Sequence, residues 1–145
     1  MGFRGEALPS IAAVSKVRLT TVARHDEVGT QLWLTGGTIT RVEDAAAIPG
    51  TTIDVSELFF NTPARRKFLK STTTEFSHIS HVVQQAALAW PQVHMRLVHN
   101  GYEVFALPAV SSPRDRVLQV YRAAFGERAL AVDVERDGLS LKGFI

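Results

Sequence analysis

The chain of 145 residues has no cysteine, and only 8% of its residues are aromatic. Without cysteine it has no disulfide framework, no thiolate metal ligand and no cysteine nucleophile. No apolar stretch reaches the length of a membrane span, and the first residues lack the apolar core of a signal peptide. The net charge is only +2, so any surface that attracts nucleic acid must be local. With 46% hydrophobic residues, the composition is that of a globular protein.

The first half of the chain predicts a β-rich unit that ends in a short basic helix. Alternating, β-branched segments indicate strands at residues 17–23, 28–34, 38–42 and 50–58. A helix is expected from Thr62 and Pro63, because threonine can cap a helix and proline suits its first position. The apolar side chains of Ile53, Val55, Ile11 and Val14 are expected to form an exposed apolar face.

The second half predicts helices and hairpins. Apolar residues at helical spacing indicate a helix over 76–90, with Thr72 and Glu75 at capping-box spacing. Asn100-Gly101 is the strongest hairpin signal in the chain. Beyond a linker at 108–112, a helix is expected from Ser112 to Phe125. A last pair of strands is expected around Asp137-Gly138, at residues 132–135 and 139–145.

A glycine-rich segment stands at the start of the chain. Gly2 and Gly5 flank Phe3-Arg4, and Glu6-Ala7-Leu8 follows. Such a loop before a helix lets main-chain amides approach an anion such as a phosphate. The same pattern also fits a plain turn and helix start. A helix that begins near Glu6 would tolerate Pro9 in its first turn.

A second cluster reads GTTIDV at residues 50–55 and LFFNTPARRKFL at residues 58–69. Together with segment 2–8, it resembles the MutL family of DNA mismatch repair proteins, which belong to the GHKL ATPase superfamily. The resemblance covers essentially the whole chain and implies an α+β fold. Residues 1–109 would be the C-terminal half of a GHKL (Bergerat-type) ATPase sandwich, with a mixed sheet and helices on one face. Residues 112–145 would begin a ribosomal-protein-like transducer domain.

The resemblance implies that the complete protein uses ATP and Mg²⁺. The residues that would end the ATP lid, with main-chain amides on the phosphates, are Gly2, Phe3, Arg4, Gly5, Glu6, Ala7 and Leu8. Thr51 would lie at the floor of the adenine pocket, although alone it is an ordinary strand residue. The family's catalytic glutamate and magnesium-binding asparagine are expected before Met1. The chain is therefore interpreted as a fragment without catalytic residues, inactive and without bound cofactor by itself.

The basic residues Arg65, Arg66, Lys67 and Lys70 allow two interpretations. They form either a solvated surface or a contact with DNA phosphates, which needs clustered cations but no base-reading geometry. MutL proteins bind DNA without sequence preference, and the resemblance makes Lys70 the best candidate contact. Arg65 and Arg66 would contact DNA or support the fold.

The implied function is an ATP-dependent clamp that connects mismatch recognition to strand removal. Its partners would be DNA, a mismatch-recognition protein, a downstream nuclease or helicase, and a second copy, in the bacterial cytoplasm at the nucleoid. The alternative is a DNA-binding or protein-interaction module without a nucleotide role. No metal site is expected, because His78 and His81 lack a second ligand cluster.

Overall fold

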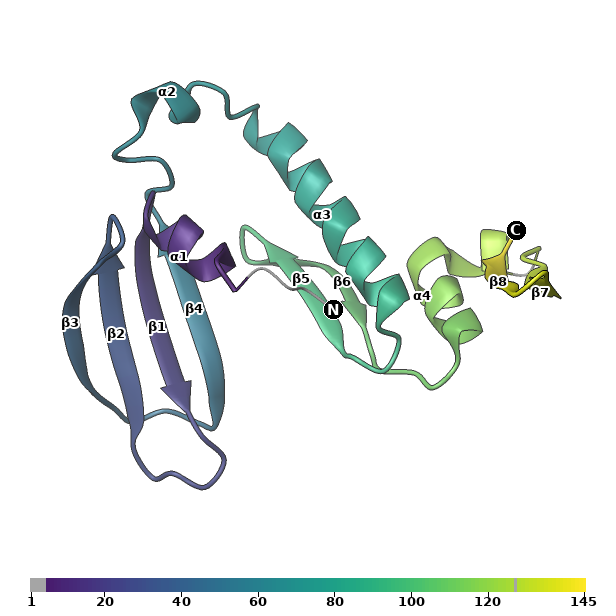
Figure 1. Ribbon diagram of the computed structural model, residues 1–145, viewed down its shortest axis with the longest axis horizontal. Helices are drawn as coiled ribbons and strands as arrows, with labels where there is room; N and C mark the ends of the chain where they lie inside the picture. The colour runs from purple at the N-terminus through teal and green to yellow at the C-terminus, as the bar shows by residue number, and fades with distance from the viewer. Residues whose placement is uncertain (1–4, 127) are drawn as a thin grey trace. The chain divides into compact units, whose positions relative to one another are not determined.

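The computed structural model describes residues 5–126 and 128–145, which divide into two compact units, up to Leu69 and from Lys70 onward. Figure 1 shows the elements in chain order. They are α1 (Ala7–Ala12), β1 (Lys16–Val22), β2 (Gly29–Thr35), β3 (Thr38–Ala45), β4 (Gly50–Ser56), α2 (Pro63–Arg66), α3 (Thr72–Ala89), β5 (Met95–His99), β6 (Tyr102–Leu107), α4 (Pro113–Gly126), β7 (Ala131–Arg136) and β8 (Leu139–Phe144). The α+β class expected from the sequence is confirmed. The expected division into an ATPase part and a transducer part near residue 110 stays a prediction.

The first unit is built on one four-stranded sheet with the order β3-β2-β1-β4 (Figure 1). The expectation of a mixed sheet is wrong for the described strands, because every pairing in this sheet is antiparallel. In the register, Leu19 of β1 lies opposite Leu32 of β2 and Ile53 of β4. Because side chains alternate across a strand, these three residues share one face of the sheet.

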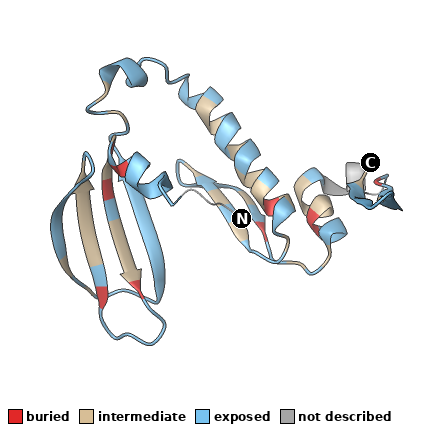
Figure 2. Ribbon diagram, viewed as in Figure 1, coloured by how far each residue is buried: buried red, intermediate tan, exposed pale blue. Residues whose placement is uncertain are grey.

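The two faces of this sheet differ in character. The apolar face carries Val17, Leu19, Leu32, Leu34, Ile53 and Val55, and α1 borders the hollow above it. This apolar face is only partly buried. Ile53 is 40% exposed and Val55 is 46% exposed. Figure 2 accordingly shows only isolated buried positions among the strands of this unit. The expected exposure is therefore confirmed for Ile53, Val55 and Ile11, whereas Val14 is half-buried.

The second unit consists of α3, α4 and two hairpins. Helix α3 contacts β5 and α4, and α4 also contacts β6. The predicted turns are confirmed, because Asn100 and Gly101 have φ angles of 50° and 81°, and Asp137 and Gly138 have 52° and 77°. Two successive residues in the left-handed region are what a tight hairpin turn requires.

The start of α3 differs from the expected capping box. Ser71, not Thr72, is the N-cap, and its hydroxyl accepts a hydrogen bond from the Thr74 amide at 3.3 Å. The Glu75 carboxylate accepts from the amide of Lys70 at 2.8 Å. The helix therefore begins four residues before the expected position at Phe76, because serine satisfies one of its free amides.

One charged side chain lies in the interior of the second unit. Arg116 of α4 is fully buried, and its guanidinium donates hydrogen bonds to three main-chain carbonyls. These belong to Leu107 at 3.0 Å and to Pro91 and Val93 at 2.6 Å each. Arg116 thus joins α4 to the end of β6 and to the segment between α3 and β5.

Candidate functional site

The expected phosphate-binding segment leads into α1. Gly2, Phe3 and Arg4 lie outside the described residues. Gly5, Glu6, Ala7 and Leu8 are all exposed. The helix begins as expected, with Glu6 at the N-cap position, its carbonyl accepting from the Ser10 amide at 2.9 Å, and Pro9 in the first turn. A side chain added at Gly5 would meet nothing within 4 Å, so this part of the main chain is open to a ligand.

A hollow of about 320 Å³ lies between α1 and the apolar face of the sheet. From α1 it is lined by Leu8, Pro9 and Ile11. From the sheet it is lined mainly by aliphatic side chains, among them Leu19, Leu32, Ile53 and Val55. This hollow suits an apolar group or a flat ring better than a charged one.

Thr51 lies on the same face, farther along β4. It is opposite Thr21 of β1, and the two hydroxyls are 2.9 Å apart. Ile53, two residues away on the same face, lines the hollow. The structure thus brings Thr51 and α1 to one face of one sheet. Thr21 was missed from the sequence, because its pairing with Thr51 depends on strand register.

The expected DNA-binding side chains are all exposed. Arg65 and Arg66 lie in the last turn of α2, and Lys70 directly precedes the N-cap of α3. Within the described part of the chain, no ion pair involves any of these residues or Lys67. Their charges are therefore available to an external anion.

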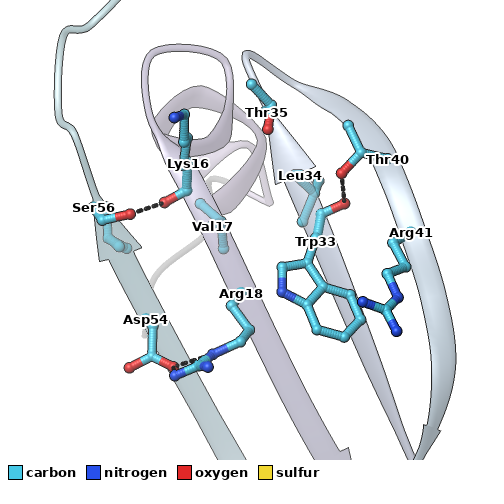
Figure 3. Close-up of a pocket in the computed structure, with 11 residues that line it drawn as sticks. Lys16, Val17, Arg18, Trp33, Leu34, Thr35, Thr40, Arg41, Asp54 and Ser56 are labelled. Carbon is cyan, nitrogen blue, oxygen red and sulfur yellow. Dashed lines mark hydrogen bonds and ion pairs between the residues drawn. The ribbon is translucent and has the colours of Figure 1, made fainter.

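The polar face of the sheet has the opposite arrangement, because its cations are paired with carboxylates, as Figure 3 shows for Arg18 and Asp54. Lys16 bonds to Glu57 at 2.7 Å, and Arg18 bonds to Asp54 at 2.8 Å. Arg41 pairs with Glu43, and its guanidinium lies over the Trp33 ring, 4.7 Å from the centroid. A wide hollow of about 750 Å³ is bordered by Lys16, Arg18, Trp33, Arg41 and Asp54. Since cations and acids balance there, this face offers no net positive charge to DNA.

The loop after β4 holds the end of α1. Asn61 donates from its side-chain amide to the carbonyl of Ala13 at 2.9 Å. Sequence reasoning assigned no role to Asn61, because its partner lies 48 residues away in the chain. Its only sequence signal is its place in the segment LFFNTPARRKFL, which carries the family resemblance. Thr62 occupies the expected N-cap position of α2, but its hydroxyl makes no capping hydrogen bond.

The described residues contain neither a cluster suited to a metal ion nor a helix suited to a membrane. Among the described residues, no group of three or more histidines and carboxylates is placed to hold a metal ion. In the same part of the chain, no helix is both long and apolar enough to span a membrane.

Solved structures with the same fold identify the class of protein. The chain is similar to the Aquifex aeolicus MutL ATPase domain complexed with ADP, with a TM-score of 0.86 and 32% identity over 97% of this chain and 55% of that one. The ATPase domain of the mismatch repair endonuclease Aquifex aeolicus MutL also matches, with a TM-score of 0.80, 28% identity, and coverage of 99% of this chain and 54% of that one. The fold is that of a segment of a MutL-type, GHKL ATPase region.

Curated sequences give the family. DNA mismatch repair protein MutL of Acidobacterium capsulatum is 45% identical over 136 residues, which cover 94% of this chain and 20% of that protein. MutL of Thiobacillus denitrificans is 45% identical over 145 residues, all of this chain and 24% of that protein. No protein-family model matches the chain. The chain belongs to the MutL family of DNA mismatch repair proteins, and it spans about a fifth to a quarter of the length of these relatives.

Proposed function

We propose that this chain forms one side of the ATP site of a DNA mismatch repair protein of MutL type. The similarity to a MutL ATPase domain complexed with ADP carries this proposal. The residues proposed to contact the nucleotide are Gly2, Phe3, Arg4, Gly5, Glu6, Ala7, Leu8 and Thr51. Catalytic residues are not assigned within the described part of the chain.

The described residues suit one wall of a nucleotide site. The exposed residues Gly5, Ala7 and Leu8 carry main-chain N–H groups, which are the donors that a phosphate needs, whereas Pro9 in the first turn has none. The aliphatic hollow beneath α1 suits an apolar ring, and the Thr51 and Thr21 hydroxyls supply polar groups on the same face. In the complete protein Mg²⁺ would accompany the nucleotide phosphates, and we assign it no ligand in this chain.

A chimeric protein tests the nucleotide proposal. This chain would replace the 145 matching residues of Thiobacillus denitrificans MutL. The chimera should bind ATP, and Thr51→Val should weaken binding by about 2- to 10-fold, the equivalent of one net hydrogen bond. Thr52→Val is the matched control, because Thr52 points to the opposite face of the same strand. Absence of ATP binding by the unsubstituted chimera would refute the proposal.

We further propose that Lys70, with Arg65 and Arg66, contacts DNA phosphates without reading sequence. The support is the contrast in pairing: the sheet cations have carboxylate partners, whereas the described structure gives these three residues none. An unpaired cation can neutralise a phosphate and release a counterion without first breaking an internal ion pair.

The salt dependence of binding tests the DNA contact. In the chimera, Lys70→Glu should weaken affinity for any duplex and reduce the slope of log affinity against log salt by about one unit, as expected for one lost phosphate contact. Lys142→Glu makes the same change in charge at a lysine already paired with Asp133, at 3.2 Å, and should change the slope less. Equal slopes for Lys70→Glu and the unsubstituted protein would show that Lys70 is only a solvated surface residue.

The complete protein would act as an ATP-dependent clamp linking mismatch recognition to strand removal. It would work as a homodimer on DNA, with a mismatch-recognition protein and a downstream nuclease or helicase, in the cytoplasm at the nucleoid. The competing function is a DNA-binding or interaction module that uses no nucleotide. A chimera that binds DNA with the expected salt slope but does not bind ATP would favour that module.

A further inference from the structure

Three consecutive carbonyls after α1 are each held by a donor from a distant loop. The Ala13 carbonyl accepts from the Asn61 side-chain amide at 2.9 Å. The Val14 carbonyl accepts from the Phe59 amide at 2.6 Å, and the Ser15 carbonyl from the Gly36 amide at 3.1 Å. The last carbonyls of a helix have no partners within the helix. Ala13 is the C-cap of α1, and the tertiary structure supplies the partner of its carbonyl, whereas Val14 and Ser15 follow the helix.

The loop that provides two of these donors is strained. Glu57 and Phe59 have φ angles of 50° and 63°, in the left-handed region that residues with a bulky side chain rarely adopt. Such a conformation persists only where surrounding contacts enforce it, and it occurs preferentially at functional sites. The short bond from the Phe59 amide to Val14 is one such contact.

Asn61 is the only one of the three donors that belongs to a side chain, so it is the one that a substitution can remove. Its amide nitrogen is also near the β2–β3 turn, where a side chain added at Gly36 would come within 3.4 Å of it. On the other side of the same turn, an added side chain at Gly37 would come within 3.4 Å of the Ala13 main chain. The end of α1 is therefore confined between this turn and the 57–61 loop.

We propose that Asn61 is a positioning residue for the nucleotide-binding segment. By capping the Ala13 carbonyl, it fixes the end of α1 and hence the direction from which residues 5–8 approach the nucleotide. This inference rests on the nucleotide function proposed above. What is required of Asn61 is an N–H donor at this place. An aspartate of the same shape would instead set a carboxylate oxygen against the carbonyl.

The neighbouring residue provides a matched control. The Thr62 hydroxyl is buried and, within the described part of the chain, has no hydrogen-bond partner. Thr62→Val keeps the shape of the side chain and removes no hydrogen bond, whereas Asn61→Asp keeps the shape and removes one. A difference between these two variants therefore reports the Asn61 bond itself.

Hydrogen exchange and ATPase kinetics of the chimera test the proposal together. Asn61→Asp should accelerate amide exchange at residues 10–14 by about 2- to 10-fold, the effect of one net hydrogen bond, and leave β1–β4 unchanged. It should raise the KM for ATP by a similar factor and change kcat less, because the binding segment is displaced and no reacting group is lost. Thr62→Val should change neither.

The outcomes separate the two proposals. Unchanged exchange and KM in Asn61→Asp would overturn the role of Asn61. Acceleration spread evenly over β1–β4 would also overturn it, because it would mean that Asn61 only stabilises the unit. Failure of the unsubstituted chimera to bind ATP would instead refute the nucleotide function. The exchange at residues 10–14 would still decide whether Asn61 holds α1.

Discussion

Substitution of the buried Arg116 by methionine should strongly destabilise the second unit. Arg116 is fully buried, and its three hydrogen bonds reach the carbonyls of Leu107, Pro91 and Val93. Methionine has a similar length and helix propensity, so the change mainly removes the donors. It leaves the carbonyl of the buried Leu107 without this donor and removes a hydrogen bond from each of the less buried Pro91 and Val93 carbonyls, of which Pro91 still accepts from the Val110 amide at 2.9 Å.

The size of the effect follows from opposing contributions. Each buried acceptor left without a partner costs about 1–3 kcal/mol. Removing the cation recovers part of the free energy that its burial costs. We therefore expect a loss of about 3 kcal/mol in the free energy of unfolding, a large share of the roughly 5–15 kcal/mol typical of a domain.

Urea unfolding monitored by tryptophan fluorescence measures this loss. Trp90 belongs to the second unit and precedes Pro91, whose carbonyl Arg116 binds, whereas Trp33 belongs to the first. In a Trp33→Phe background, Trp90 therefore reports the second unit alone. Arg114→Met is the matched control, because Arg114 is an exposed arginine of the same helix. It should change stability by less than about 0.5 kcal/mol. Equal stabilities of the Arg116→Met and Arg114→Met variants would refute the reasoning.

Three further outcomes are expected. Gly101→Ala should destabilise the β5–β6 hairpin by about 1 kcal/mol in thermal unfolding, because φ at Gly101 is 81°; an unchanged melting temperature would contradict this. Arg18→Ala should cost less than about 1 kcal/mol, since Arg18 and Asp54 have side chains 53% and 49% exposed, and a larger loss in urea unfolding would contradict it. The chain should self-associate through its exposed apolar face, and Ile53→Lys should shift it toward monomer in sedimentation equilibrium; a monomer at all concentrations would exclude this contact.

Most of the secondary structure could be predicted from the sequence, because the signals that determine it are local. Strands in the first unit have the alternation that half-buried strands require, and Asn100-Gly101 has the residue types that a tight turn demands. The first-turn position of Pro9 was likewise predictable from the steric rules for proline. In each case the deciding interaction lies within a few residues of the signal.

The contacts that shape the candidate site are not local. Asn61 and Ala13 are 48 residues apart, and Thr21 and Thr51 are 30 apart. Arg116 lies on a helix whose pattern gives no reason to bury an arginine, and its burial becomes favourable only because three carbonyls converge on it. Such pairings depend on register and on how loops fold back, which residue periodicity does not encode.

The cations of the sheet form ion pairs with carboxylates, whereas those in and after α2 form none among the described residues. The sequence alone does not show this difference. Arg18 and Arg65 carry the same side chain. Arg18 lies opposite Asp54 on a neighbouring strand and pairs with it, whereas helix α2, which carries Arg65, has no acidic residue in its first turn. A DNA phosphate that approached Arg18 would have to displace an existing carboxylate, so it would gain little net free energy. At Arg65 the phosphate would replace only water and counterions, and the gain would come from counterion release. The polar face of the sheet is therefore a poorer surface for DNA than the segment that carries Arg65, Arg66, Lys67 and Lys70, even though both carry cations.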